Sequence, residues 1–455
     1  MIQKKDFSIQ KARRNELLES IKREYDVAQE SLVLLVAGFE TDRTAFWQEG
    51  SFLYYTDITE AATAMTLDFA NKTSLYIPNC GEVREKWIYS PLALTQENAK
   101  QLGVDTVKVL GDKCAGYQLF PFFKAENYSA IISRLKKLVA DGAMLFTLYP
   151  KNEHEYVEQR LVINHLSDFV PGLKERIVDI SAIVADMRRR KDMDEITKLS
   201  KAIEITELAH EAAAQAIKAG MLECEVQASL EYMMIGAESR PSFPSIVATG
   251  KNATILHYMA NNAELKDGDL VVVDIGSVFE GYCSDITRTY PVSGKFTARQ
   301  KELYNLVLDV QTYIADNAKP GMYLRNAEHP EQSLHHLALH YFKERGYEKY
   351  FIHGIGHFLG LDVHDVGDVT KPLQENDVFT IEPGLYIPEE GIGIRIEDDY
   401  WMGKKGCISL SENLPKTAQE IEALVQQQFE DDSLDRDDDD DDDIIDFSDL
   451  RATEH

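Results

Sequence analysis

Apolar and polar residues alternate along the first 183 residues in a way that predicts strands and helices in turn. The apolar runs SLVLLVAGFE, SFLYYTDI, TSLYIPN and AMLFTLYP are candidate strands, and helical periodicity follows over residues 127–139 and 153–166. Strands and helices that alternate along a chain are typical of an α/β fold. We therefore expect residues 1–183 to form an α/β N-terminal domain.

The pattern changes after residue 183. Residues 187–217 carry apolar side chains at helical spacing, and GMLECEVQASLEYMMIGAE predicts a second helix. From residue 242 onward the pattern predicts strands and hairpins, in the runs SFPSIVATG, TILHY, DLVVVDIG, GYCSDITRTYPV, FTIEPGLYI and GIGIRIEDDYWM. A pair of helices is predicted between these runs, over residues 297–317 and 329–344. Residues 184–429 are therefore expected to form an α+β domain built mainly from antiparallel hairpins.

The last segment, residues 430–455, is strongly acidic. It holds 14 acidic and 2 basic residues, so it carries −12 of the chain's net charge of −29 and leaves −17 on the rest. Like charges at this density repel, so we expect the segment to be disordered. We favour a solvated tail without a role in the chemistry over the alternative, an acidic docking segment. The acidic balance also argues against nucleic acid as a partner.

Nothing in the sequence predicts export or a membrane segment. No apolar run reaches the roughly 18 residues that a transmembrane helix needs. The N-terminal stretch is charged and lacks the apolar core of a signal peptide. The five cysteines are widely spaced and form no CxxC pair, so they are expected to be reduced thiols. We expect a cytoplasmic protein without a membrane partner.

Two aspartates flank the first predicted hairpin of the second domain. Asp274 ends an apolar run, and Asp285 follows eleven residues later. A tight hairpin centred between Phe279 and Glu280 would place the two carboxylates opposite one another, with Cβ atoms about 5 Å apart. Carboxylates this close in apolar surroundings repel and need a cation or a proton between them. For this hairpin alone, backbone hydrogen bonds to each aspartate are the structural alternative.

A second predicted hairpin repeats this arrangement. Glu382 and Glu397 are equidistant from the midpoint of FTIEPGLYIPEEGIGIRIEDD, so they too would face one another. The histidines of HGIGHFLGLDVHD lie between the two hairpins in sequence and are candidate nitrogen ligands or proton carriers. Four carboxylates and one imidazole suit two divalent metal ions about 3.5–4 Å apart. The oxygen-rich ligand set favours Mn(II), with Co(II) or Zn(II) as alternatives.

These segments resemble those of the pita-bread metallopeptidases, the family of aminopeptidase P, prolidase and methionine aminopeptidase. In the family's order, residues 187–424 contain ILHY, VVVDIG, GYCSDITRTYPVSGKF, HGIGHFLGLDVHD, FTIEPGLYI and GIGIRIEDD. FWQEGSFLYYT at residues 46–56 resembles the N-terminal domain of the aminopeptidase P and prolidase branch. The resemblance implies a pita-bread (creatinase/aminopeptidase-like) catalytic domain. It also implies that a hydroxide bridging two metal ions hydrolyses the bond between an N-terminal residue and proline.

The resemblance assigns the metal ligands residue by residue. Asp274 chelates one ion alone, Asp285 and Glu397 bridge the pair, and His357 and Glu382 complete the second site. Glu382 is also the implied proton shuttle.

Histidine spacing decides which imidazole is the ligand. In methionine aminopeptidases a second histidine follows the ligand by seven positions. His364 lies seven residues after His357, whereas Gly360 lies seven residues after His353. The resemblance therefore assigns His357 to the metal, His364 to the substrate carbonyl or the tetrahedral oxyanion, and His353 to the substrate side of the pocket.

Three further residues match family positions. His257 in ILHY matches a histidine that contacts the substrate near the scissile bond. Arg395 resembles an arginine that orients a ligand carboxylate and borders the substrate pocket, with a role as counter-charge alone as the alternative. Thr287 resembles a residue that supports the chelated metal from outside its ligand set.

The chain departs from the family pattern at two places. Thr56 is followed by Asp57 where the family usually has glycine, and the segment after Trp87 lacks the glycine and arginine that often follow that tryptophan. In relatives this tryptophan can reach the active site of a neighbouring subunit. A half-buried aromatic residue without that role is the alternative for Trp87.

Several functions share parts of this pattern. Aminopeptidase P and prolidase share all the metal ligands, and the compact connection in GLYIPEEGIGIRIEDD favours aminopeptidase P, with prolidase as the alternative. A non-catalytic pita-bread protein that binds partners is disfavoured because this chain keeps all five ligands. Histidine spacing disfavours methionine aminopeptidase, and the retained metal site disfavours a creatine-hydrolysing relative. The resemblance implies a homodimer or homotetramer that acts on peptides with proline at the second position.

Overall fold

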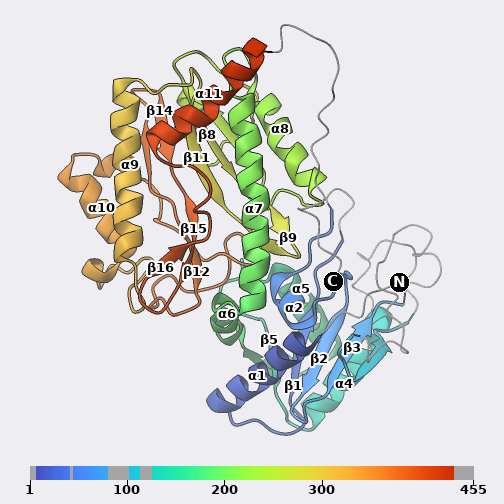
Figure 1. Ribbon diagram of the computed structural model, residues 1–455. Helices are drawn as coiled ribbons and strands as arrows, with labels where there is room; N and C mark the ends of the chain where they lie inside the picture. Colours follow the sequence, from blue (N-terminus) through green and yellow to red (C-terminus); the bar gives the residue numbers. More distant parts are fainter. Residues whose placement is uncertain (1–6, 41–44, 80–101, 113–124, 435–455) are drawn as a thin grey trace. The chain divides into compact units, whose positions relative to one another are not determined.

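The computed structural model describes residues 7–40, 45–79, 102–112 and 125–434 (Figure 1). The chain divides into two compact units, Met1–Arg188 and Arg189–His455. Helix α6 (Ser181–Arg189) ends at this division, and the boundary expected after residue 183 falls inside it.

The first unit is built on a mixed sheet with strand order β4-β3-β2-β1-β5-β6. β1 pairs in parallel with β5 and antiparallel with β2. Residues of β1 and β5 share a hydrophobic core with α4 and α5. The strands are β1 (Leu32–Val36), β2 (Ala64–Asp68), β3 (Thr73–Ile77), β4 (Thr106–Val109), β5 (Leu145–Thr147) and β6 (Ile177–Asp179). The helices are α1 (Ser8–Glu24), α2 (Gly50–Thr56), α4 (Ser129–Ala140) and α5 (Val157–Phe169), with 3-10 turns η2 (Ala125–Tyr128) and η3 (Lys174–Arg176).

The run SFLYYTDI, predicted as a strand, instead forms helix α2. The Glu49 side chain accepts hydrogen bonds from the backbone N–H groups of Ser51 and Phe52, at 2.9 and 2.7 Å, and so caps the first turn. Aromatic residues are common in strands, but this cap provides acceptors for the free N–H groups of the first helical turn and so favours the helix. The helix ends at Asp57, whose φ of 54° is left-handed. This is the conformation that glycine adopts most readily, so glycine would be less strained than Asp57 at this position.

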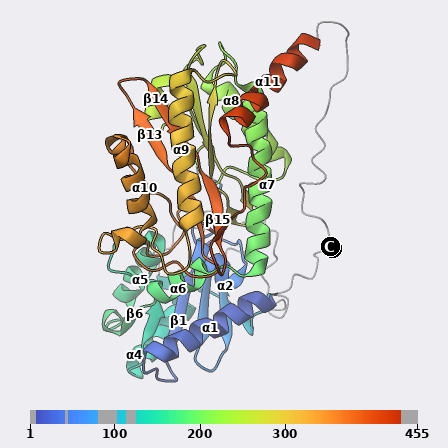
Figure 2. The same ribbon diagram turned by 60° about the vertical axis from the view of Figure 1, so that its left-hand side comes forward.

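The helical run predicted over residues 187–217 is divided between two helices, the end of α6 and the first helix that lies wholly in the second unit, α7 (Met193–Ala216). α6 ends at Arg189, and α7 starts after Asp192. The Asp192 side chain accepts from the Glu195 N–H at 3.0 Å and the Glu195 side chain accepts from the Asp192 N–H at 3.0 Å, so a capping box begins the new helix. Figures 1 and 2 both show α7 and α9 running along the strands. The other helices are α8 (Glu223–Gly236), α9 (Ala298–Asn317), α10 (Leu334–Glu344) and α11 (Ala418–Leu434), with 3-10 turns η4 (Gly250–Thr254), η5 (Pro330–Gln332) and η6 (Glu348–Tyr350).

Antiparallel pairs make up the strands of the second unit, as the sequence predicts. β8 pairs with β7 and β11, β15 pairs with β12 and β16, β13 pairs with β14, and β9 pairs with β10. The strands are β7 (Ile246–Thr249), β8 (Leu270–Ile275), β9 (Val278–Phe279), β10 (Tyr282–Cys283), β11 (Ile286–Pro291), β12 (Val378–Ile381), β13 (Gly384–Ile387), β14 (Ile392–Arg395), β15 (Asp398–Met402) and β16 (Cys407–Ser409).

The run TILHY, predicted as a strand, forms no strand. It begins at the end of η4 and continues into a turn. The Ile255 N–H donates to the Asn252 carbonyl at 2.9 Å, which closes this turn locally. The backbone at this point is therefore folded rather than extended.

The register of the first hairpin differs from the prediction. β8 and β11 pair so that Asp274 lies opposite Thr287 and not opposite Asp285. The turn falls on Glu280 and Gly281, whose φ values are 47° and 88°. A two-residue hairpin turn with positive φ at both positions matches the right-handed twist of the flanking strands, and glycine is the preferred residue at the second position. This moves the centre by one residue and makes Asp285 a diagonal neighbour of Asp274.

The second hairpin keeps its predicted centre. β13 and β14 pair with Gly384 opposite Arg395 and Ile387 opposite Ile392, which places the turn on the predicted midpoint. The ladder ends at the Gly384–Arg395 pair. Glu382 and Glu397 therefore lie just beyond its paired residues, and Glu397 forms an isolated bridge with Thr287 instead.

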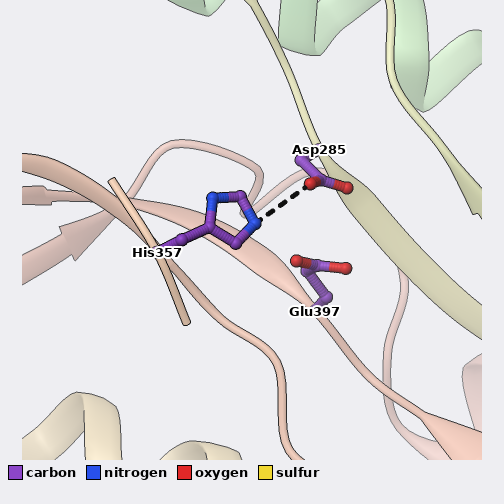
Figure 3. A group of neighbouring side chains, drawn as sticks. All are labelled: Asp285, His357 and Glu397. Atoms are coloured by element: carbon purple, nitrogen blue, oxygen red, sulfur yellow. Dashed lines mark ion pairs between the residues drawn. The ribbon is translucent and has the colours of Figure 1, made fainter. Parts of the chain in front are cut away.

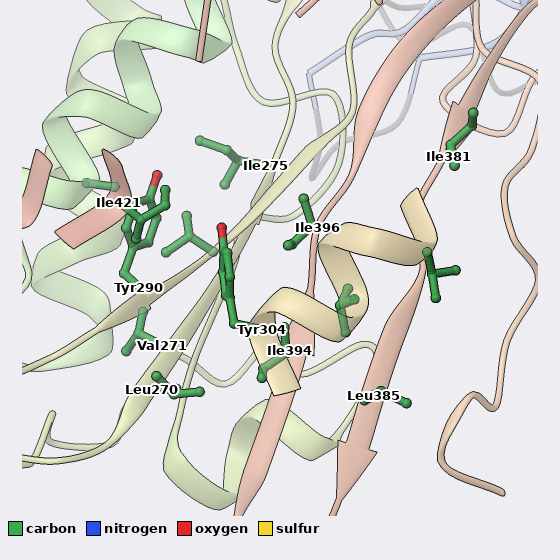
Figure 4. Packing of buried hydrophobic residues seen from close by; sticks show 14 of the residues in the cluster. Leu270, Val271, Ile275, Tyr290, Tyr304, Ile381, Leu385, Ile394, Ile396 and Ile421 are labelled. Atoms are coloured by element: carbon green, nitrogen blue, oxygen red, sulfur yellow. The ribbon is translucent and has the colours of Figure 1, made fainter. Parts of the chain in front are cut away.

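A hydrophobic core fixes the strands of the second unit against its helices. Figure 4 shows part of it, with Val271 of β8, Tyr290 of β11, Tyr304 of α9 and Ile394 of β14. Burying one large apolar side chain contributes about 1.5–3 kcal/mol. The core thus fixes β8, β11 and β14, the strands that carry or adjoin the predicted acidic ligands.

Other predictions concern features outside this core. Among the described cysteines, Cys224, Cys283 and Cys407 are all free thiols. Trp87 lies outside the described residues, as does the tail beyond α11, whose last turns include residues 430–434. In the part of the chain that the structure describes, no helix combines the length and the apolar content that crossing a bilayer requires.

Candidate metal centre

Asp285, His357 and Glu397 converge on one point in the second unit (Figure 3). One donor atom from each side chain lies within 4.8 Å of the other two. His357 Nε2 is 3.3 Å from Asp285 Oδ2. The two carboxylates are buried and the imidazole is half-buried. Two oxygen donors and one nitrogen donor at this spacing can share a divalent cation.

Glu382 and Asp274 border this cluster. Glu382 Oε1 is 3.7 Å from His357 Nε2. Asp274 Oδ2 accepts a hydrogen bond from Arg395 Nη2 at 2.5 Å. Asp274 Oδ1 is buried without a hydrogen-bond partner among the described residues. A buried carboxylate oxygen without a partner is costly to desolvate, and a bound cation would remove that cost.

Backbone and side-chain hydrogen bonds bring these distant residues together. The Glu397 N–H donates to the Thr287 carbonyl at 3.1 Å, and Thr287 Oγ1 donates to Glu397 Oε2 at 2.7 Å. The buried Arg288 donates from Nη1 to the backbone carbonyls of both residues, at 3.0 and 2.8 Å. His357 is held beside β12, because its carbonyl accepts from the Thr380 N–H at 2.9 Å.

The electrostatics of the cluster fit bound cations. Burial raises the pKa of Asp285 well above its usual value, and the charges of Asp274 and Asp399 raise it further. Burial likewise raises the pKa of Glu397, with Asp285 and Glu382 adding to the effect. Burial also raises the pKa of Glu382. Buried carboxyl groups at this density are unfavourable as anions unless protons or metal ions neutralise them, and their oxygen-rich set fits a pair of divalent cations.

Three further histidines lie near the cluster. The His364 ring centroid is 4.1 Å from that of His357, and burial lowers the pKa of His364 to about 4, helped by His357 and His257. His353 Nδ1 is 3.4 Å from Glu382 Oε2, and burial lowers the pKa of His353 to about 3. Both imidazoles are therefore neutral near pH 7. His257 is exposed and lies within electrostatic reach of both imidazoles.

Arg395 connects the metal side of the cluster to the histidine side. Besides its ion pair with Asp274, its Nε donates to Thr287 Oγ1 at 3.1 Å and its Nη1 donates to the Tyr386 hydroxyl at 2.8 Å. The Tyr386 hydroxyl also lies 3.0 Å from His353 Nε2. The sequence reasoning missed Tyr386. Its place on the strand opposite Arg395 in the predicted hairpin was the available signal.

Asp399 was missed as well. Its Oδ2 accepts a hydrogen bond from the Asp285 N–H at 3.2 Å, and it lies in the strand that directly follows Glu397. Two successive aspartates after a predicted ligand were the only signal in the sequence. Their burial depends on contacts with strands far away in the chain, which no local pattern records.

The chain is similar to known metallopeptidases. The model of the family described as metallopeptidase family M24 matches residues 197–404. The chain is 31% identical over 434 residues to the Xaa-Pro aminopeptidase of Escherichia coli (strain K12), covering 87% of this chain and 93% of that protein. It is 38% identical over 247 residues to the Xaa-Pro dipeptidase of Pyrococcus horikoshii, covering 53% of this chain and 67% of that protein.

Solved structures extend this likeness over both units. The structure of E. coli aminopeptidase P with the inhibitor Pro-Leu superposes with a TM-score of 0.78 at 28% identity, covering 94% of this chain and 99% of that one. The likeness confirms the predicted fold class, an α/β N-terminal domain followed by an α+β pita-bread domain.

Proposed function

The chain belongs to metallopeptidase family M24, and from this premise we propose that it hydrolyses the bond between an N-terminal residue and a following proline in peptides. The observation that carries the proposal is the buried cluster of Asp285, His357 and Glu397, in a chain whose likeness to an Xaa-Pro aminopeptidase covers 93% of that enzyme. An oxygen-rich, buried cluster of this kind is what metal-assisted hydrolysis requires.

The proposed metal site has five protein ligands. Two divalent ions would be held by Asp274, Asp285, His357, Glu382 and Glu397. Mn(II) suits the oxygen donors best, with Co(II) or Zn(II) as alternatives. When bound, the ions supply Lewis acidity that makes water a nucleophile near neutral pH and polarises the scissile carbonyl.

The chain's own residues do the remaining chemistry. His364, neutral and beside His357, donates a hydrogen bond to the substrate carbonyl or to the oxyanion that forms from it. His353 lies on the substrate side of the pocket, and His257 contacts the substrate near the scissile bond. Arg395 borders the pocket and holds Asp274 through their ion pair. Glu382 carries the proton from the attacking water to the leaving proline nitrogen.

The setting of the enzyme is also a proposal. We infer a cytoplasmic homodimer or homotetramer that binds neither nucleic acid nor membrane, whose N-terminal domain spans residues 1–183 and whose acidic tail takes no part in the chemistry. Gel filtration of the purified protein tests the assembly. A monomer mass across the working concentration range would contradict it.

A dipeptidase activity is the second candidate. The observation that favours it is the higher identity, 38%, to the P. horikoshii Xaa-Pro dipeptidase, although that match covers only 53% of this chain. The match to the E. coli Xaa-Pro aminopeptidase covers more of both proteins. We therefore place the aminopeptidase first.

Three peptides separate these candidates. Arg-Pro-Pro, Arg-Ala-Pro and Gly-Pro are incubated with metal-free protein, with and without added Mn(II), and the released amino acids are measured. The proposal expects release of arginine from Arg-Pro-Pro alone, only with metal, and none from the variant Asp285→Asn. Faster cleavage of Gly-Pro would establish the dipeptidase. Failure to cleave any of the three would support a non-catalytic binding protein.

A further inference from the structure

The loop that carries His257 is anchored by apolar packing only in part: Ala253 and Tyr258 pack against Ile246, Ala248 and Val272, but the residues nearest the tip do not. Ile255 and Met259, on either side of His257, are 53% and 57% exposed. A segment that buries few apolar side chains has low local stability unless other contacts hold it. Polar contacts at the base of the loop therefore add to this packing in fixing the position of the histidine.

Glu223 supplies such contacts from the first residue of α8. Its side chain is fully buried. Oε1 accepts hydrogen bonds from the Thr249 N–H at 2.8 Å and from Asn252 Nδ2 at 3.2 Å. Oε2 accepts from the Tyr258 hydroxyl at 2.9 Å and from the Ala263 N–H at 2.8 Å. One carboxyl group thus ties together chain segments that precede and follow the tip of the loop.

The position of Glu223 favours this role. It lies in the first turn of α8, where the helix dipole stabilises an acidic side chain. Both oxygens act only as acceptors, and hydrogen bonds to a charged acceptor are roughly twice as strong as neutral ones. A buried carboxyl group without partners would be strongly destabilising, so these four donors and Glu223 depend on each other.

Asn261 provides a second anchor to the same loop. Its backbone is left-handed, with φ of 42°, and its side chain is buried. Oδ1 accepts from the Val247 N–H at 3.1 Å, and Nδ2 donates to the Ser245 carbonyl at 2.7 Å and to Gln227 Oε1 at 2.9 Å. The end of the loop is thereby fixed to β7 and α8, and Glu223 controls the part that lies closer to His257.

From these contacts we propose that Glu223 is a positioning residue for His257: it holds the loop of residues 250–263 so that the imidazole faces the metal centre. Tyr258, the neighbour of His257, transmits the constraint directly through its hydroxyl. This inference rests on the proposed function, in which His257 contacts the substrate.

Hydrogen exchange tests the anchor itself. Amide exchange of residues 250–263 is compared in the full-length wild type, in Glu223→Gln and in Tyr258→Phe. Glu223→Gln weakens the acceptor of all four hydrogen bonds, so amide exchange in this segment should accelerate at least tenfold. Tyr258→Phe removes one donor, so its exchange should accelerate less. Glu225→Gln is the matched control, because it neutralises an exposed acidic residue in the same turn of α8, and glutamine can still accept the hydrogen bond from the Leu222 N–H that Glu225 accepts at 2.7 Å. Unchanged exchange in both test variants would overturn the proposal.

A double-mutant cycle tests the functional consequence. We expect Glu223→Gln to lower kcat/KM for Arg-Pro-Pro about tenfold with metal content unchanged, and to have less than a twofold effect in a His257→Ala background. Tyr258→Phe removes only the hydroxyl that donates to Glu223, and it should show the same dependence on His257 with a smaller loss of kcat/KM. Equal losses in both backgrounds would mean that Glu223 acts only on general stability and would overturn the proposal. A wild-type enzyme silent on the peptide would instead contradict the proposed function, and this inference with it.

Discussion

Arg395 and Asp274 form an ion pair that is almost wholly buried, with Nη2 donating to Oδ2 at 2.5 Å. Nε and Nη1 of the same guanidinium group donate to Thr287 and Tyr386. The geometry therefore favours a counter-charge role for Arg395, the alternative that its position in the sequence left open. An arginine whose three side-chain nitrogens each donate a hydrogen bond within the protein is held in place to orient a metal ligand.

Replacing Arg395 should weaken metal binding. In Arg395→Gln the Asp274 carboxylate loses its cation and its orientation, and loss of a partner of this kind lowers metal affinity or activity about 10–100-fold. Isothermal titration with Mn(II) and kcat/KM for Arg-Pro-Pro measure both. Arg299→Gln is the control, since Arg299 pairs with Glu390 at the surface at 2.7 Å. Equal metal affinity in Arg395→Gln and the wild type would show that Asp274 does not need this arginine.

Neutralising one acidic ligand should stabilise the metal-free protein and abolish its response to metal. In Glu397→Gln the repulsion that raises the carboxyl pKa values in the cluster is relieved, while the Thr287 hydroxyl keeps a hydrogen-bond partner. The wild type should gain about 2.7 kcal/mol when free Mn(II) is 100 times the dissociation constant. Thermal melts with and without Mn(II) record both effects. A variant that Mn(II) stabilises as much as the wild type would argue against Glu397 as a ligand.

The sequence predicted the order of hairpins and helices because strand alternation and helical period are local properties. It misplaced the centre of the first hairpin by one residue, since Gly281 and not the midpoint between the aspartates decides where the turn forms. The carboxylates nonetheless converge, because a shift of the pairing by an even number of residues keeps Asp274 and Asp285 on one face. The sequence pattern therefore predicts that the two aspartates share a face of the hairpin, but it does not predict which residues pair across the strands.

The sequence could not predict contacts that depend on packing between distant segments. SFLYYTDI has the composition of a strand, but the cap from Glu49 makes it a helix. Tyr386 belongs to the site because its hydroxyl contacts both Arg395 and His353, and only the folded structure shows these contacts. Glu223 carries no motif at all, and its role follows from four donors that the fold brings to one side chain.

A methyl group at Gly393 should displace the loop that carries His257. An ideal Cβ at this position of β14 would lie 1.9 Å from the Ala253 carbonyl oxygen, a backbone atom that can yield only if η4 moves. We expect Gly393→Ala to lower stability by about 1–3 kcal/mol. It should also lower kcat for Arg-Pro-Pro by more than the loss of folded protein explains.

The matched control for this variant is Gly406→Ala, where the nearest atom would lie at an ordinary 3.4 Å. Urea unfolding gives the stability of both variants, and kcat is measured on protein that is shown to be folded. A Gly393→Ala enzyme with wild-type kcat would show that the loop tolerates the displacement.

Removing the acidic tail should leave the peptidase nearly unchanged. Ile421 and Val425 of α11 are buried in the core of the second unit, so the truncation must keep the helix and delete residues 435–455. The expected change in kcat/KM is less than twofold, measured at low salt, where a long-range effect of the removed charge would be greatest. A loss beyond tenfold would support the docking-segment alternative.

His210 should make the second unit sensitive to acid. Burial lowers its pKa from 6.5 to about 3 in the folded protein. Its ring nitrogens lie 3.1 Å from the Tyr290 hydroxyl and 3.0 Å from the Ile286 carbonyl, which a neutral imidazole satisfies by accepting from the first and donating to the second. The unfolded chain therefore binds one more proton than the folded chain between these pH values. The free energy of unfolding must fall as pH decreases, by about 1.4 kcal/mol per pH unit from this residue.

The variant His210→Gln isolates this contribution, because an amide can make both hydrogen bonds and does not titrate. Its free energy of unfolding in urea, measured from pH 7.5 to 4.5, should fall less steeply than that of the wild type below pH 6.5, while the two slopes agree above it. His353 and His364 titrate equally in both proteins and cancel in the comparison. His340→Gln, at an exposed position, should keep the wild-type slope. Parallel curves for His210→Gln and the wild type would mean that the imidazole is protonated in the folded state, and that the low pKa ascribed to its burial is wrong.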